Sequence, residues 1–186
     1  MFKNVVNTIS LLLIVVVLLM SSCSSPRKYS QKSSKRSKVE RARSTAKVNK
    51  KNSTSKSYNS KRTKIVSTAK KYIGKSYTYG GKKPSTGFDC SGFISHVYKN
   101  NGIDLSGPSH YQAKQGKKKS MSALQKGDLV FFGTNKKVSH VAIVTKVDQN
   151  KLNVIHSTSS RGVVIDDISS SEYWKKRYLF GRDVMN

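Results

Sequence analysis

The sequence has very few cysteines, few acidic residues and no apolar run long enough for an ordinary membrane span. Two cysteines among 186 residues exclude a scaffold held together by several disulfides, so the fold must depend on its hydrophobic core. Nine acidic residues stand against 36 lysines and arginines, which gives a formal net charge of +27. A chain of this length has room for one ordinary domain with extensions.

The first 22 residues are typical of an export signal. Lys3 precedes an unbroken apolar run from Leu11 to Leu19, which is too short to cross a bilayer comfortably. The following Met20-Ser21-Ser22-Cys23 resembles a bacterial lipobox, in which cleavage leaves the cysteine as the lipid-bearing first residue. We therefore expect a lipoprotein signal peptide over residues 1–22 and a lipid on Cys23. The alternative is an ordinary cleaved signal beside an unmodified cysteine.

The next segment, residues 23–64, has the composition of a tether. After Cys23 it holds fifteen lysines and arginines, one acidic residue, Glu40, and almost nothing apolar. Such a segment cannot bury enough apolar surface to fold, so we expect it to be disordered. It is either a solvated spacer or a segment attracted to anionic lipid head groups or to an anionic wall polymer.

The basic charge would also suit a nucleic acid. An export signal removes the chain from cytoplasmic nucleic acid, and no nucleic-acid-binding motif is present. We therefore expect no nucleic-acid partner.

Residues 65–186 read as the folded domain, with helices before strands. Apolar residues at helical spacing predict a helix from Ile65 to Ile73, which Gly74 would end. A second helix is expected to begin at Cys90, with Asp89 as its N-cap and Phe93, Ile94, Val97 and Tyr98 on its buried face, and to end at Asn101-Gly102.

The rest of the domain predicts a sheet. Four strands are expected at 128–132, 140–147, 152–156 and 163–165, and a possible fifth at 179–185. The run Ser169-Ser170-Ser171-Glu172 has the spacing of a capping box and predicts a short helix through Lys176. A helix-rich half followed by a sheet-rich half favours an α+β fold over a parallel α/β sheet.

Cys90 is the candidate nucleophile. If Cys23 carries lipid, Cys90 has no partner for a disulfide, and an unpaired thiol in an exported protein is open to oxidation, so its presence calls for a reason. In the first turn of a helix, unpaired N–H groups and the helix dipole stabilise a thiolate and can also bind an oxyanion. The alternative is an inert cysteine in the core.

Two histidines could complete the site. His140 begins an apolar strand and His156 ends the next one, so His140 could act as the base and His156 could orient it. In an antiparallel pair of strands, the two histidines point to the same face only if the numbers of residues that lie opposite each other add up to an even number. This requires a hairpin loop with an odd number of residues or a β-bulge. We interpret His96 and His110 as structural. No tight cluster of ligands predicts a metal.

Five ordered motifs together resemble the NlpC/P60 family of cell-wall cysteine peptidases. They are Tyr77-Thr78-Tyr79-Gly80-Gly81, Phe88-Asp89-Cys90-Ser91-Gly92-Phe93, Gly127-Asp128-Leu129-Val130-Phe131-Phe132, Ser139-His140-Val141 and Ile155-His156-Ser157. The resemblance covers essentially all of residues 65–186. It implies a papain-like fold, with N-terminal helices packed on an antiparallel sheet, and hydrolysis of amide bonds in peptidoglycan stem peptides.

The resemblance also implies roles for individual residues. Cys90 would be the nucleophile, His140 the base and then the acid, and His156 the third member of the triad. Tyr79 would help to bind the oxyanion, and Asp89 and Ser91 would help to hold the free amine of the substrate. Asp89 could instead serve chiefly as a helix cap, and Tyr79 could chiefly pack.

The C-terminal stretch, including Tyr173-Trp174-Lys175-Lys176-Arg177-Tyr178, is similar to the Spr-type lipoprotein endopeptidases, which cut the D-alanyl to diaminopimelate cross-link. Many other family members cut between γ-D-glutamate and the diamino acid, and this chain lacks the arginine that is common after the catalytic helix. An inactive wall-binding module and an N-acyl transferase are further alternatives.

The expected protein is a monomer that needs no cofactor. Because Ser24, and not an aspartate, follows Cys23, we expect the lipid to anchor it in the outer membrane, facing the periplasm.

Overall fold

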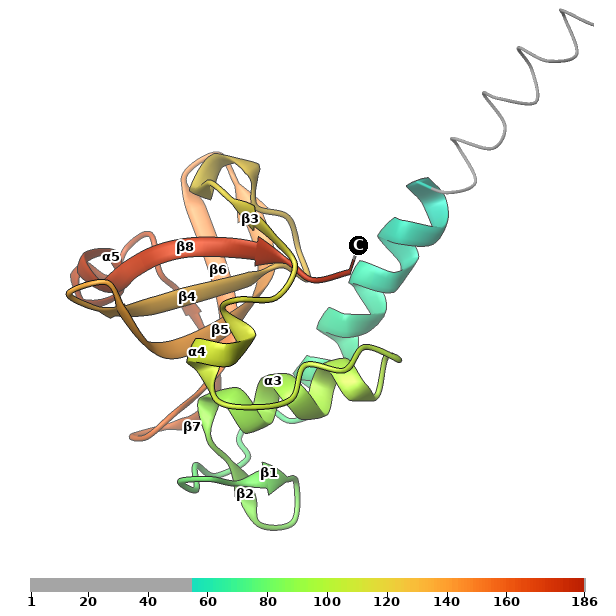
Figure 1. The fold of residues 1–186 in the computed structure, drawn as a ribbon, viewed down its shortest axis with the longest axis vertical. Coiled ribbons are helices and arrows are strands. Elements are labelled where there is room, and N and C mark those ends of the chain that lie inside the picture. The colour runs from blue at the N-terminus through green and yellow to red at the C-terminus, as the bar shows by residue number, and fades with distance from the viewer. Residues whose placement is uncertain (1–54, 186) are drawn as a thin grey trace, which may run out of the picture. The chain divides into compact units, whose positions relative to one another are not determined.

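The computed structural model describes residues 55–185, which form one α+β unit (Figure 1). The predicted signal peptide, Cys23 and most of the predicted tether lie outside these residues. Within the described part of the chain, no helix is long and apolar enough to cross a membrane.

The described chain begins in a helix over residues 55–70, so the prediction of a disordered tether is wrong for residues 55–64. Arg62 is only 1% exposed and forms ion pairs with Asp128 at 2.6 Å and Asp183 at 2.5 Å. The hydroxyl of Tyr58 also donates to Asp183, at 2.6 Å. Two carboxylates supplied by distant segments therefore order a stretch that has little apolar surface of its own.

The second predicted helix is confirmed. After the turn at residues 71–74, where Gly74 has a φ of +82°, a short hairpin of β1 (Lys82–Lys83) and β2 (Gly87–Phe88) leads to α3 (Cys90–Lys99). Its predicted buried face is confirmed, because Phe93, Ile94, Val97 and Tyr98 are fully buried.

A six-stranded antiparallel sheet forms the second half of the domain. Its order is β3-β8-β4-β5-β6-β7. The strands are β3 (Lys117–Lys119), β4 (Leu129–Thr134), β5 (Lys137–Asp148), β6 (Lys151–Thr158), β7 (Gly162–Asp167) and β8 (Tyr178–Asp183). The five expected strands correspond to β4–β8, and the α+β class is confirmed. The hairpin β1–β2, strand β3 and the short helix α4 (Ser109–Gln112) were not predicted.

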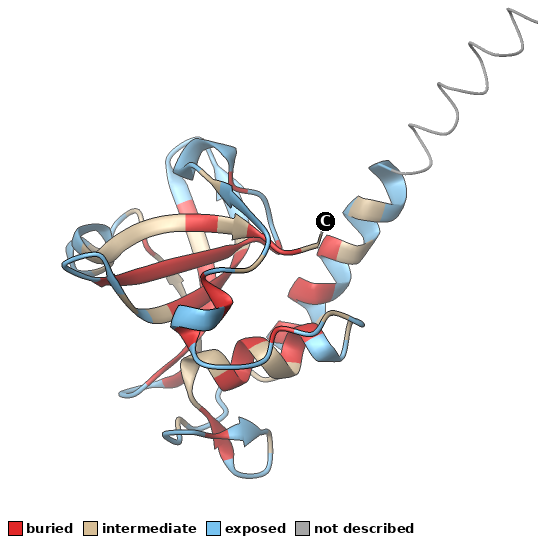
Figure 2. Cartoon of the chain, viewed as in Figure 1, coloured by how far each residue is buried: buried red, intermediate tan, exposed pale blue. Residues whose placement is uncertain are grey.

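Each face of the sheet carries its own apolar layer. Val141 and Ile143 of β5 face the layer shared with α3, while Ala142 and Val144 face a second layer beside α5 (Glu172–Arg177). Strand β4 lies in the middle of the sheet and is buried over most of its length (Figure 2). The N-cap of α5 is Ser171, whose side chain accepts from Trp174 N. The capping box predicted at Ser169 is therefore displaced by two residues.

A β-bulge sets the register between β5 and β6. Near the turn, Val147 pairs with Leu152, but beyond Thr145 the pairs become Val144 with Val154 and Ile143 with Ile155. The residue numbers of opposite residues therefore add up to an odd number near the turn and to an even number beyond Thr145. This is the bulge that the sequence required if His140 and His156 were to share one face.

Candidate active site

Cys90 is the first residue of α3, as predicted, and is partly buried. The backbone N–H groups of Val141, Ser91 and Cys90 interact with its sulfur and lower its pKa. Burial and then the Asp89 carboxylate act more strongly in the opposite direction and raise the pKa of Cys90 to about 11. In the unliganded protein the thiol is therefore protonated at neutral pH.

Asp89 fixes the start of this helix. Its Oδ1 accepts from Gly92 N at 2.6 Å and from Ser91 Oγ at 3.0 Å, and its Oδ2 accepts from Gly80 N at 3.0 Å. The cap role of Asp89 is confirmed. The same carboxylate holds the loop that carries Tyr79 against α3, so Asp89 and Ser91 position the elements around the sulfur.

Two tyrosines of this loop lie near the site in different environments. Tyr79 is 92% exposed, so the alternative that it chiefly packs is wrong. Burial and then the charge of Cys90 raise the pKa of Tyr77. Tyr77 is therefore close enough to the thiol to interact with it electrostatically, which the sequence did not predict.

The structure brings His140 and His156 together. His140 Nε2 lies 3.0 Å from His156 Nδ1, and His156 is fully buried. Burial and then His156 lower the pKa of His140 to about 3, and burial also lowers the pKa of His156. Both imidazoles are therefore neutral at neutral pH.

Two further residues, neither of them predicted from the sequence, extend this pair. His156 Nε2 lies 3.0 Å from Asp166 Oδ2, and Arg161 binds both carboxylate oxygens of Asp166, NH1 to Oδ1 at 3.0 Å and NH2 to Oδ2 at 2.5 Å. The hydrogen bond from Arg161 is the main cause that lowers the pKa of Asp166, so the carboxylate stays charged. Asp166 lies on β7, where Val164 pairs with His156, so sheet register alone brings it within reach.

The charge of Asp166 determines which nitrogens carry protons. A carboxylate only accepts hydrogen bonds, so His156 Nε2 must be the N–H donor. A neutral His156 then presents a lone pair at Nδ1, and His140 Nε2 must donate to it. The remaining nitrogen of His140, Nδ1, is therefore unprotonated, as a general base requires.

Trp174 of α5 covers the histidine pair. Its ring stacks on His140, with centroids 5.0 Å apart and planes 27° apart, and its centroid is also 5.0 Å from that of His156. This aromatic cover keeps water from the hydrogen bond between the imidazoles and strengthens it.

The start of α3, which carries Cys90, meets β5, which carries His140, at the backbone N–H of Val141. Within residues 55–185 no hydrogen bond joins the sulfur to His140, and the link between them is the N–H of Val141, the residue after His140. His96 and His110 take no part: His96 Nε2 lies 2.9 Å from the Tyr72 hydroxyl, and the His110 ring packs against Tyr111 in a tilted arrangement. No group of three or more potential metal ligands occurs in the described residues.

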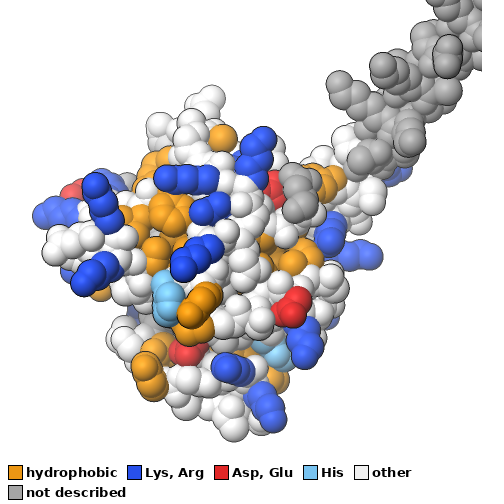
Figure 3. Space-filling model, in the orientation of Figure 1, with side chains coloured by type: hydrophobic (Ala, Val, Ile, Leu, Met, Phe, Trp, Pro, Cys, Tyr) orange, Lys and Arg blue, Asp and Glu red, His pale blue; other side chains and the backbone are white. Residues whose placement is uncertain are grey.

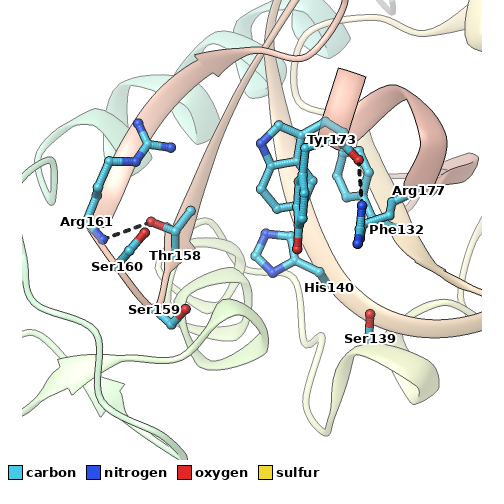
Figure 4. A pocket seen from close by; sticks show the side chains of 10 residues that line it. Phe132, Ser139, His140, Thr158, Ser159, Ser160, Arg161, Tyr173 and Arg177 are labelled. Atoms are coloured by element: carbon cyan, nitrogen blue, oxygen red, sulfur yellow. Dashed lines mark hydrogen bonds between the residues drawn. The ribbon is translucent and has the colours of Figure 1, made fainter. Parts of the chain in front are cut away.

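A pocket of about 450 Å³ opens beside His140 (Figure 4). His140, Tyr173, Trp174 and Arg177 lie on its walls, and Cys90 is not among its lining residues. The site therefore has a thiol at a helix N-terminus, a polarised imidazole pair, and a cavity on the imidazole side.

Known proteins share sequence and fold similarity with this chain. The chain is 39% identical over 139 residues to a probable endopeptidase p60 of Listeria grayi, a match that covers 75% of this chain and 26% of that protein. It is 32% identical over 126 residues to the murein DD-endopeptidase MepS/murein LD-carboxypeptidase of Escherichia coli, covering 67% and 64%. The chain thus spans about a quarter of the p60 protein.

Among solved structures, the NlpC/p60 domain of the peptidoglycan hydrolase SagA matches with a TM-score of 0.56 and 35% identity. This match covers 66% of the present chain and 97% of that one. The NlpC/P60 family profile matches residues 74–183, which include Cys90, His140, His156 and Asp166. The chain belongs to the NlpC/P60 family.

Proposed function

We propose that this protein is a cysteine endopeptidase that hydrolyses amide bonds in peptidoglycan stem peptides. The observation that carries the proposal is the hydrogen-bonded chain from Asp166 through His156 to His140, beside a cysteine at a helix N-terminus. This hydrogen-bonded chain leaves an unprotonated nitrogen on His140, and the Val141 N–H lies at the Cys90 sulfur.

In the first step the Cys90 sulfur attacks the carbonyl carbon of the substrate while its proton passes to His140 Nδ1. The Cys90 thiol and the His140 imidazole are both neutral before the reaction, so no thiolate exists beforehand. His140 therefore removes the thiol proton as a general base while the sulfur attacks. The developing oxyanion would accept the N–H of Cys90 and, by family resemblance, the hydroxyl of the exposed Tyr79. Cleavage of the C–N bond then transfers the proton from His140 to the leaving amine and leaves a thioester on Cys90.

In the second step water attacks the thioester. His140 Nδ1 removes a proton from the water, the acyl group leaves as a carboxylic acid, and the thiol is restored. No cofactor enters either step. The Asp166 carboxylate stabilises the positive charge on the imidazole pair while His140 holds the proton, and Arg161 holds that carboxylate in place.

The D-alanyl to diaminopimelate cross-link is the bond we propose, since the C-terminal segment of the chain is similar to the lipoprotein endopeptidases that cut it. The γ-D-glutamyl to diamino acid bond is the second candidate. We also propose that residues 1–22 are a signal peptide and that a lipid on Cys23 anchors a monomer in the outer membrane, facing the periplasm.

Mass analysis of purified muropeptides treated with the full chain in detergent tests this function. Cleavage of cross-linked dimers to monomers is expected, and Cys90→Ala and His140→Asn should abolish every product. Products that persist in Cys90→Ala would overturn the mechanism. Binding without any product in the unmodified chain would support an inactive wall-binding module, and transfer of an acyl group would support the N-acyl transferase alternative.

A further inference from the structure

The pocket beside His140 contains a cation, Arg177, that the proposed reaction does not use. Two arginines, Arg161 and Arg177, line it, together with Ser139 and the loop hydroxyls of Ser159 and Ser160, and none of its lining residues is Asp or Glu (Figure 4). Hydroxyl groups and guanidinium groups without carboxylates suit an anion.

The two arginines differ in whether their charge is available. Arg161 is bound through two hydrogen bonds to Asp166, so its charge is balanced. Arg177 has no carboxylate partner within residues 55–185, because its neighbours Glu172 and Lys175 pair with each other. Its charge is therefore free to act on a ligand.

Arg177 is also held in place before any ligand arrives. Its guanidinium lies over the Tyr173 ring, 3.7 Å from the centroid, and its NH1 donates to the Tyr173 carbonyl at 3.2 Å. Stacking of the planar group leaves most of its N–H donors unused and reduces the entropy that a ligand must remove. The side chain is therefore prepared to bind a planar anion such as a carboxylate through two hydrogen bonds.

The position of the pocket indicates which part of a substrate would enter it. His140 must contact the leaving nitrogen in order to protonate it, whereas Cys90 must contact the carbonyl carbon. The pocket borders His140 and not Cys90, so it lies on the side of the leaving amine.

We infer that Arg177 binds a carboxylate on the residue that supplies the leaving nitrogen, and that this contact makes the enzyme selective for acid over amide at that position. The inference rests on the proposed hydrolase function. A D-alanyl to diaminopimelate cross-link has such a carboxylate, since the carbon that bears the acylated nitrogen also carries a carboxyl group. In the γ-D-glutamyl to diamino acid bond of a longer stem, the corresponding carboxyl is engaged in the next peptide bond. The contact thus favours the cross-link.

Binding measurements with the Cys90→Ala full chain test this inference without turnover. Two synthetic cross-linked peptides would be compared, identical except for a free carboxylate or a carboxamide on the residue that supplies the leaving nitrogen. Trp174 is the only tryptophan of the chain and lines the pocket, so its fluorescence reports occupancy, and calorimetry gives the Kd independently.

The acid is expected to bind about tenfold more tightly than the amide, because charge-assisted bidentate hydrogen bonds are among the stronger polar contacts. This preference should disappear in the additional variant Arg177→Gln and remain in Lys176→Gln, which removes an exposed cation from the same helix outside the pocket. Raising the salt concentration should weaken binding of the acid more than binding of the amide.

Equal affinities for the acid and the amide would overturn the inference, as would a preference that survives Arg177→Gln. Cleavage assays with the unmodified chain separate this result from the function itself. If both peptides are cut at equal rates, the hydrolase stands and the role of Arg177 falls. If neither peptide is cut while the acid still binds preferentially, the site stands and the hydrolase falls.

Discussion

His156 donates from Nε2 to Asp166 Oδ2 at 3.0 Å, and this single contact sets the proton positions of the whole imidazole pair. Replacement of Asp166 by Asn removes the charge and allows an amide N–H to face His156. The opposite tautomers then become accessible, and a proton can occupy His140 Nδ1. We expect kcat to fall roughly 10- to 100-fold, a part of the ~10²–10⁴ that general-base catalysis contributes, with little change in KM.

The ¹⁵N shifts of the His140 ring nitrogens provide the check, since a purely structural role for Asp166 would not change the tautomer. Asp167→Asn serves as the matched control, because Asp167 bonds Ser169 and not the histidines. Unchanged ¹⁵N shifts in Asp166→Asn would contradict the assignment of Asp166 as a positioning residue.

Cys90 should be slow to alkylate at neutral pH. Burial and Asp89 raise its pKa to about 11, so the thiolate fraction increases about tenfold per pH unit between pH 7 and 10. The rate of reaction with iodoacetamide should follow that slope, and His140→Asn should leave the rate at pH 7 unchanged, because His140 is neutral there. A rate that is already constant from pH 6 to 8 would instead indicate a preformed thiolate.

Arg62 should contribute strongly to stability. In Arg62→Met the buried carboxylates of Asp128 and Asp183 lose one of the two cations that they share and keep only Lys119. The loss of one member of such a buried network costs about 3–5 kcal/mol. Urea unfolding would measure the change. Lys64→Met, at an exposed position of the same helix, should stay within about 0.5 kcal/mol of the unmodified chain. A chain that begins at residue 65 should be destabilised as strongly as Arg62→Met.

Gly92 lets the loop that carries Tyr79 reach the start of α3. A Cβ at this position would lie 2.0 Å from the Gly81 carbonyl oxygen, a contact that only backbone movement can relieve. Gly92→Ala should therefore lose about 1–3 kcal/mol of stability and most of its activity, because the movement displaces Asp89 and Cys90.

Gly102→Ala is the comparison variant for this prediction. Gly102 has a φ of +73° and open space around it, so alanine there introduces backbone strain without a clash. It should lose stability while keeping its catalytic rate. Full activity of Gly92→Ala would mean that the loop and the helix need not touch.

The sequence predicted the elements that have a clear local signal. Asp89 as a cap, the apolar face of α3 and the alternation along β5 and β6 follow from spacing within one element. The shared face of His140 and His156 also followed, because the side chains of a strand alternate and the alternative registers could be enumerated.

Features that depend on pairing between distant segments could not be predicted. Asp166 reaches His156 only through the register of β6 and β7, and Arg62 is held by distant residues, namely Asp128, Asp183 and the Lys126 carbonyl. In composition, Arg62 belongs to a run of lysines and serines that has every property of a disordered segment. The arrangement of basic side chains on the surface likewise comes from the fold and not from the order of residues (Figure 3).

The bulge at Thr145 has a consequence for how this protein can vary. Thr145 is the extra residue on β5, between Lys146, which pairs with Asn153, and Val144, which pairs with Val154. If Thr145 paired with Val154 in a regular ladder, the register before it would slip by one residue, and His140 and His156 would lie on opposite faces of the sheet. Deletion of Thr145 would instead keep the pairs Val144–Val154 and Ile143–Ile155, so both imidazoles would stay on one face.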